Sequence, residues 1–169
     1  MLTTTGSKTM GFSEVSTLLW REREALQLLL FKLVEEQLIV SAGHTRWLAQ
    51  ANDEIEAALD NLRGTEVLRA AEVDVIADEL GLPAPPTLAE LATLAPEPWG
   101  TLFGEHRQAL LKLVAEVEGA TGHNRALLAA GARAVRQTLL SVTESVQTYD
   151  SQGSAAATPN GPMLMDEQA

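Results

Sequence analysis

Residues 98–149 carry a single apolar stripe at the spacing of an α-helix. From Leu110 onward, apolar side chains recur every three or four residues, which keeps them on one side of a helix. They are Leu113, Val117, Ala120, Leu127 or Leu128, Val135, Leu139, Val142, Val146 and Tyr149. Such a helix would span roughly 75 Å at about 1.5 Å rise per residue. It cannot bury this stripe by folding on itself, so we expect it to pack against other long helices.

Two further long helices are predicted in the first half of the chain. The first covers residues 12–42, and its apolar stripe is interrupted by Glu22 and Glu36. These two acids suggest a seam that is open to water in places or that meets a cation. Ser41-Ala42-Gly43-His44 is typical of a helix end, because glycine readily adopts the left-handed conformation there. We therefore interpret the region as a hairpin, with a second helix at residues 45–80.

One alternative to the hairpin stays open. A continuous helix with a phase shift is also compatible with the pattern, because a glycine costs only about 1 kcal/mol in a helix interior. Within the second helix, Arg63-Gly64-Thr65 is a candidate site for fraying or a kink.

The second helix is followed by a connector and a short helix. Gly81-Leu82-Pro83 ends the second helix, since proline cannot propagate it. Thr87 and Glu90 have the spacing of a capping box and predict a short helix at 87–94. By composition, residues 1–11 and 154–169 are expected to be disordered. The predicted fold is all-α: one helical domain over residues 12–153, an elongated antiparallel bundle or coiled coil of three long helices plus one short helix.

The last helix has two unusual features. Gly119, Gly122 and Gly131 each weaken it by about 1 kcal/mol relative to alanine. Either close packing against a neighbour justifies these glycines, or the segment is adaptable. Arg125, Arg133 and Arg136 are interpreted as a solvated face that complements an acidic hairpin, with partner docking as the alternative.

Composition and charge limit the classes of function. The chain has no cysteine, so disulfides, thiolate catalysis and cysteine-ligated metals are excluded. Residues 12–82 hold six Lys and Arg against fourteen Asp and Glu, which argues against nucleic acid because phosphate contacts need clustered cations. No apolar run approaches about 18 residues, and residues 1–11 lack the apolar segment of a signal peptide. We expect a cytoplasmic protein without stable membrane insertion.

No catalytic or cofactor-binding arrangement is visible. His44, His106 and His123 are scattered, without a second ligand at a familiar spacing, so we expect each at the surface or at a boundary. We predict no enzyme activity, no metal site and no cofactor. For the tryptophans we expect core packing, with partner contact as the alternative, and of the three, Trp20, Trp47 and Trp99, Trp20 is the one expected to be partly exposed.

Several ordered motifs resemble the FlgN family of flagellar type III export chaperones. They are the Ala42-Gly43-His44 turn, Leu80-Gly81-Leu82-Pro83, the short helix Thr87-Leu88-Ala89-Glu90-Leu91, Asn124-x-x-Leu127-Leu128 and Thr148-Tyr149-Asp150-x-x-Gly153. The resemblance covers roughly residues 12–153. It implies a cytoplasmic, non-enzymatic protein that binds the hook–filament junction proteins FlgK and FlgL and delivers them to the flagellar export gate.

The resemblance also implies where partners bind. In the family, the C-terminal part of the chain is associated with cargo binding, which points here to Asn124, Leu127, Leu128, Val135, Leu139, Val142 and Val146. Tyr149 and Asp150 are the candidates for contact with the export gate or the cargo. The rival hypothesis is a structural or adaptor coiled coil that binds another helical partner, although the proline-rich break at 83–98 is unusual for one. An enzyme would need polar groups converging inside the stripe, where only Glu22, Glu36 and Asn124 qualify.

Overall fold

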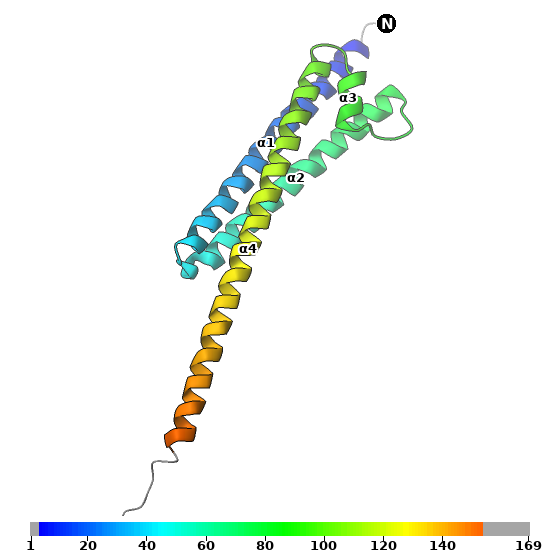
Figure 1. Ribbon diagram of the computed structural model, residues 1–169. Coiled ribbons are helices and arrows are strands. Elements are labelled where there is room, and N and C mark those ends of the chain that lie inside the picture. The colour runs from blue at the N-terminus through cyan, green and yellow to red at the C-terminus, as the bar shows by residue number, and fades with distance from the viewer. Residues whose placement is uncertain (1–3, 154–169) are drawn as a thin grey trace, which may run out of the picture. The chain divides into compact units, whose positions relative to one another are not determined.

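The computed structural model describes the backbone of residues 4–153 and the side chains of residues 11–141. Its elements are α1 (Thr4–Ser41), a 3-10 turn (Thr45–Trp47), α2 (Leu48–Leu80), α3 (Leu88–Leu94) and α4 (Trp99–Gly153) (Figure 1). All the regular structure in this part of the chain is helical. The prediction of an all-α fold with three long helices and one short helix is confirmed.

Contacts group the chain into two units, Met1–Leu127 and Leu128–Ala169, with the boundary inside α4. The sequence analysis treated residues 12–153 as one domain, so the division is a feature that the pattern did not indicate. The two units are described separately below.

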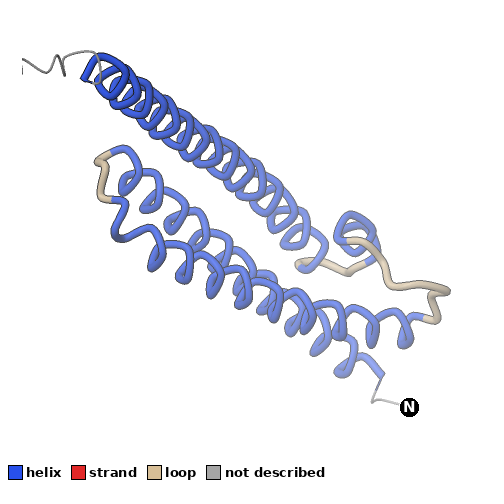
Figure 2. The backbone as a smooth tube through the Cα atoms, turned by 90° about the horizontal axis from the view of Figure 1, so that it is seen from below, coloured by secondary structure: helices blue, strands red, loops and turns tan. Residues whose placement is uncertain are grey.

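A tight turn joins α1 to α2, as Figure 2 shows. Gly43 has a φ of 72°, the left-handed conformation. His44 N–H donates to the carbonyl of Ile39, and Gly43 N–H donates to that of Val40. This pair of hydrogen bonds is the Schellman motif, which satisfies carbonyls at the end of a helix. The hairpin prediction is confirmed, and the alternative of one continuous helix is wrong.

Two boundaries differ from the expected ones. α1 begins at Thr4, eight residues before the expected start, so residues 4–11 are helical where the composition suggested disorder. Gly11 explains how α1 continues beside α2, because a Cβ added there would lie 3.2 Å from Cγ1 of Ile76. The α-helical part of the second segment begins at Leu48, after the 3-10 turn, and α2 continues without a break through Gly64.

The connector and α3 follow the predicted signals. Gly81 caps α2 with a φ of 66°. Thr87 Oγ1 accepts from the Glu90 backbone N–H, and the Glu90 carboxylate accepts from the Thr87 N–H, which completes the capping box. These hydrogen bonds hold the pKa of Glu90 below its usual value. The peptide bond between Glu97 and Pro98, just before α4, is cis.

The core of residues 1–127 forms where all four helices meet. Its main cluster draws on every helix: Phe12, Val15, Leu19, Val73, Ile76, Leu91 and Phe103. A second cluster joins Leu29 and Leu33 of α1 to Ala58 of α2, with Val117 and Ala120 of α4 packed against it. The apolar stripes of the three long helices therefore pack against one another, as expected from their spacing.

The tryptophans divide between core and surface. Trp99 packs against the main cluster, and Trp20 is 51% exposed, as expected. Trp47 is 47% exposed, so its predicted core role is wrong. It lies in the turn where the α1–α2 hairpin reverses, and Arg46 stacks on its ring at 4.9 Å.

Of the two acids on the α1 stripe, Glu22 meets a cation. Its carboxylate accepts from Nε of Arg69 on α2 at 2.8 Å. Burial raises the pKa of Glu22, and the nearby Arg69 only partly offsets this.

No helix in the described part of the chain is long and apolar enough to cross a membrane.

Candidate partner-binding surface

A buried polar contact fixes α4 against α1 next to the predicted binding residues. Asn124 is 3% exposed, and its Nδ2 donates to the Leu33 carbonyl at 2.8 Å and to Oε2 of Glu36 at 2.7 Å. Glu36 is itself only 5% exposed, so this amide satisfies a carboxylate that has little access to water. Asn124 was predicted to bind cargo, but in the structure its side chain is buried in the interior of residues 1–127.

This contact gives a stability prediction. Asn124→Asp places a second carboxylate against Glu36 and removes the donor, so the free energy of unfolding should fall by about 2–4 kcal/mol at neutral pH. Chemical denaturation followed by circular dichroism measures the change. His123→Asp adds the same charge at the neighbouring exposed position and should have little effect. Equal stabilities for the two variants would contradict the assigned role.

A second buried polar contact lies between α4 and α1. His106 is 1% exposed, and its Nε2 is 3.4 Å from Oγ of Ser16. Its ring meets the edge of Trp20 with the centroids 5.0 Å apart, and the Arg23 guanidinium lies 4.2 Å from the centre of the Trp20 ring. Burial, followed by the charge of Arg23, lowers the pKa of His106. The expectation of a surface or boundary histidine is wrong at this position, although His44 and His123 are exposed.

The neutral His106 predicts a pH dependence of stability. Because its pKa is lower in the folded state than in the unfolded chain, the unfolded chain binds the proton more readily. The stabilisation is complete above the unfolded pKa of about 6.5 and is lost as pH falls through that value toward the folded pKa. The stability difference between the wild type and His106→Gln should therefore shrink between about pH 7.5 and about pH 5. A difference that stays constant over this interval would contradict the prediction.

Residues 128–141 of α4 differ in burial from the part of α4 that precedes them. Leu127 is half-buried, and every residue from 128 to 141 is exposed. Three large apolar side chains lie on one line of this segment, because a spacing of seven and then four residues returns to one side of a helix. They are Leu128, Val135 and Leu139, exposed by 38%, 61% and 62%. We call this line the α4 strip.

The surroundings of the α4 strip are basic and open. Arg133 and Arg136 are the only charged residues between positions 128 and 141, in a chain of net charge −11. A Cβ added at Gly119, Gly122 or Gly131 would have no neighbour within 4 Å among the described atoms. Close packing against the described part of the chain therefore does not explain these glycines.

The predicted site residues fall into three groups. Leu128, Val135 and Leu139 share the α4 strip, and Leu127 adjoins it at the boundary between the units. Asn124 is buried. Val142, Val146, Tyr149 and Asp150 lie on the backbone of α4, but their side chains fall outside the described residues. Leu140, which was not among the predicted residues, is also exposed, by 58%.

Across the side chains that the structure describes, no three His, Asp or Glu residues are grouped closely enough to hold a metal ion.

Comparison with known proteins identifies the family. No curated protein and no solved structure matches the chain. The FlgN protein family matches residues 10–157, which is most of the sequence. The chain therefore belongs to the FlgN family of flagellar export chaperones.

Proposed function

We propose that this chaperone acts in the cytoplasm, without catalysis, on hook–filament junction proteins of the FlgK and FlgL type. It binds them before export through the α4 strip, shields their amphipathic terminal helices and delivers them to the flagellar type III export gate. The family membership supports the chaperone role. The choice of cargo rests on the resemblance in the sequence.

The observation that carries the proposed site is the complete exposure of residues 128–141 around three large apolar side chains. An isolated helix of this length is marginal in water, because most helix stability in proteins comes from packing of an apolar face. A partner helix laid along the α4 strip would supply that packing, with apolar anchors at a spacing of three and four residues.

Charge supports an acidic or neutral cargo helix. Arg136 lies beside the strip, three residues before Leu139, and Arg133 is on the far side of the helix; there is no acidic residue between positions 128 and 141. Basic side chains beside an apolar anchor favour carboxylates on the partner and oppose cations. Tyr149 and Asp150, further along α4, are the residues that we propose for contact with the export gate or with the cargo.

Calorimetric titration tests the proposal. The chain is titrated with FlgK and FlgL homologues from the same organism, each full-length and without its terminal helices. We expect micromolar or tighter binding, about −8 kcal/mol or better, that is lost when those helices are removed. Binding should also be lost when the chaperone is truncated after Leu127, which leaves the contact between Asn124 and Glu36 in place.

Circular dichroism must show that the truncated chaperone is folded. If this folded protein bound cargo as tightly as the full chain, the α4 strip would not be the site. No binding of either cargo by the full chain would favour the adaptor alternative.

A further inference from the structure

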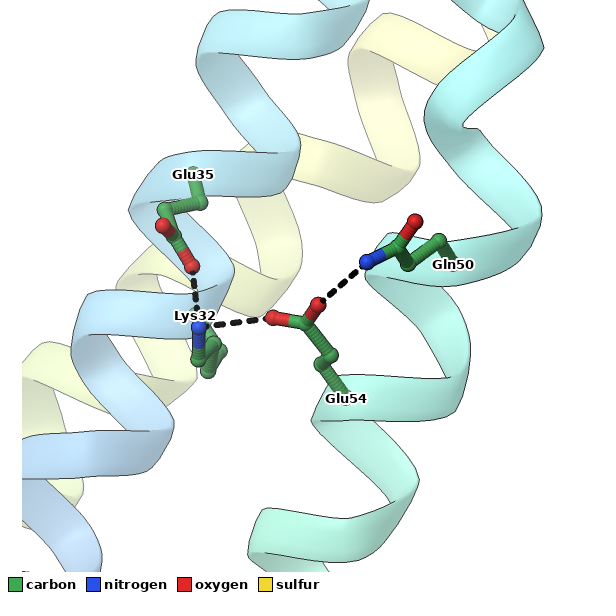
Figure 3. Close-up of polar contacts among 4 residues, drawn as sticks. All are labelled: Lys32, Glu35, Gln50 and Glu54. Carbon is green, nitrogen blue, oxygen red and sulfur yellow. Dashed lines mark hydrogen bonds and ion pairs between the residues drawn. The ribbon is translucent and has the colours of Figure 1, made fainter.

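One partly buried cation of α1 has no carboxylate partner. Within residues 11–141, the Lys and Arg side chains that are partly buried are Arg23, Lys32 and Arg69. Lys32 contacts a carboxylate of α1 at 2.7 Å and one of α2 at 2.6 Å, as Figure 3 shows, and Arg69 contacts a third at 2.8 Å. Arg23 forms no ion pair within this part of the chain, and its buried Nε donates no hydrogen bond there. Arg23 is therefore a cation with an unused donor.

A second buried donor without a partner lies on α4, close to Arg23. His106 is 1% exposed, and its Nδ1 has no hydrogen-bond partner among the described atoms. Its Nε2 lies 3.4 Å from Oγ of Ser16, and the Ser16 hydroxyl has no other acceptor in the described structure. A neutral imidazole accepts at one nitrogen and donates from the other. With Nε2 accepting from Ser16, the proton is on Nδ1, which is then a donor with nothing to bind.

Both groups line one small pocket between α1 and α4. We call it the Trp20 pocket; its lining residues are Trp20, Arg23, Leu102, Glu105 and His106. The Arg23 guanidinium lies 4.2 Å from the centre of the Trp20 ring, and the His106 ring meets the edge of Trp20 at 5.0 Å. The volume is about 250 Å³. Pockets for drug-sized ligands hold about 300–1,000 Å³, so this one suits a single small group.

The two unused donors select the chemistry of the ligand. A carboxylate has two oxygens that accept hydrogen bonds, and its bonds to a guanidinium are among the stronger ones. A cation would be repelled by Arg23, and an apolar group would leave both donors unsatisfied. We propose that the Trp20 pocket binds one carboxylate group, which accepts from Arg23 and from Nδ1 of His106. Trp20 contacts both groups and is 51% exposed, so a rotation of its side chain uncovers the two donors.

Glu105 is the acidic wall of the Trp20 pocket and opposes the ligand. It is exposed, and it forms no ion pair with Arg23 in the described structure. Its negative charge weakens the binding of a carboxylate without satisfying either donor. The proposal therefore predicts opposite effects for the two charged walls of the pocket: loss of Arg23 weakens binding, and loss of Glu105 strengthens it.

Titration of the purified full-length chain with sodium acetate tests the proposal. The experiment is run at constant ionic strength and about pH 7.5, where His106 is neutral because its pKa is lowered. NMR of the ¹⁵N-labelled chain follows the ring nitrogens of His106 and the indole N–H of Trp20. Both signals should shift to saturation in the millimolar range, since a ligand of so few atoms binds weakly. The exposed His44 and His123 should show no saturating shift.

Acetamide is the matched control ligand, because it has nearly the size of acetate and no charge. It should give no saturating shift at His106 or Trp20. The proposal is overturned if acetamide acts as acetate does, or if His106 responds to acetate no more than His44 and His123 do.

Three single substitutions separate the pocket from a general effect of charge. Arg23→Gln should weaken acetate binding at least about tenfold, because a hydrogen bond to a charged group is lost. Glu105→Gln, at an exposed position, should strengthen it several-fold. Arg21→Gln removes the same charge from an exposed position on α1 and should bind acetate as the wild type does. Equal losses in the two arginine variants, or weaker binding after Glu105→Gln, would overturn the proposal.

The carboxylate belongs either to a small free acid or to an Asp or Glu side chain of a protein partner. Competition with acetate by two compounds distinguishes these sources: free glutamate, and glutamate blocked as the N-acetyl N-methylamide, which mimics a residue within a polypeptide. Binding of the blocked form at least as tight as that of free glutamate assigns the pocket to a protein side chain. Tighter binding of free glutamate assigns it to a small acid. If neither compound displaces acetate, the proposal is overturned.

Discussion

Replacing Val135 and Leu139 together with aspartate is expected to weaken the binding of FlgK- and FlgL-type cargo by at least about 100-fold, because apolar anchors at the centre of an interface commonly contribute 1–3 kcal/mol each. Both residues are more than 60% exposed, so nothing in the fold depends on their burial. The new carboxylates would also neutralise the basic character given by Arg133 and Arg136. Titration calorimetry of the variant with each cargo measures the loss.

The matched control for this experiment is Gln137→Asp. At about 100° per residue, Gln137 points away from Val135 and Leu139 by roughly 160–200°. It adds a carboxylate to the same segment of helix, so it should change affinity by no more than a few-fold. Equal losses in the two variants would indicate a general electrostatic effect. Unchanged binding by the aspartate pair would remove the α4 strip from the proposed site.

The parts of the fold that could be predicted are those with local signals. Gly43 and Gly81 end their helices because the left-handed conformation is adopted readily only by glycine, and each sits just after a periodic apolar segment. Thr87 and Glu90 form a capping box because both partners lie three residues apart. Each of these needs only a short stretch of sequence, so no knowledge of the packing was required.

The contacts between helices could not be predicted in the same way. Glu36 and Asn124 were both recognised as polar groups on apolar stripes, but 88 residues separate them. A stripe tells which face of a helix is buried and does not tell which residue of another helix it meets. His106 was misplaced for the same reason, since its contacts with Ser16 and Trp20 join residues that are far apart in the sequence.

The candidate site shows the same division between local and long-range information. The spacing of Leu128, Val135 and Leu139 predicted that they share one face of a helix, and in the structure they do so on α4. The sequence did not reveal that the packing against α1 and α2 stops near Leu127, because the apolar stripe continues through that point with unchanged spacing. An uninterrupted stripe is compatible with burial in the chain's own core and with burial by a partner.

Phe103→Ala is expected to lower the free energy of unfolding by about 3–5 kcal/mol, the largest stability effect of any single substitution considered. Phe103 is 0% exposed, with its ring centroid 6.0 Å from that of Phe12 and 6.4 Å from that of Trp99. It belongs to the cluster that joins all four helices, so the truncation leaves a cavity that no single helix can close. Urea denaturation followed by circular dichroism measures the change.

Leu111→Ala on the same helix provides the control. Leu111 is 55% exposed, so its truncation should cost less than about 1 kcal/mol. Equal effects from the two substitutions would mean that the packing around Phe103 contributes no more than a surface leucine. Because Phe103 lies outside the α4 strip, the folded Phe103→Ala variant should also bind cargo with unchanged affinity when measured well below its unfolding temperature. A loss of affinity in that folded protein would mean that cargo recognition depends on the four-helix core as well as on the α4 strip.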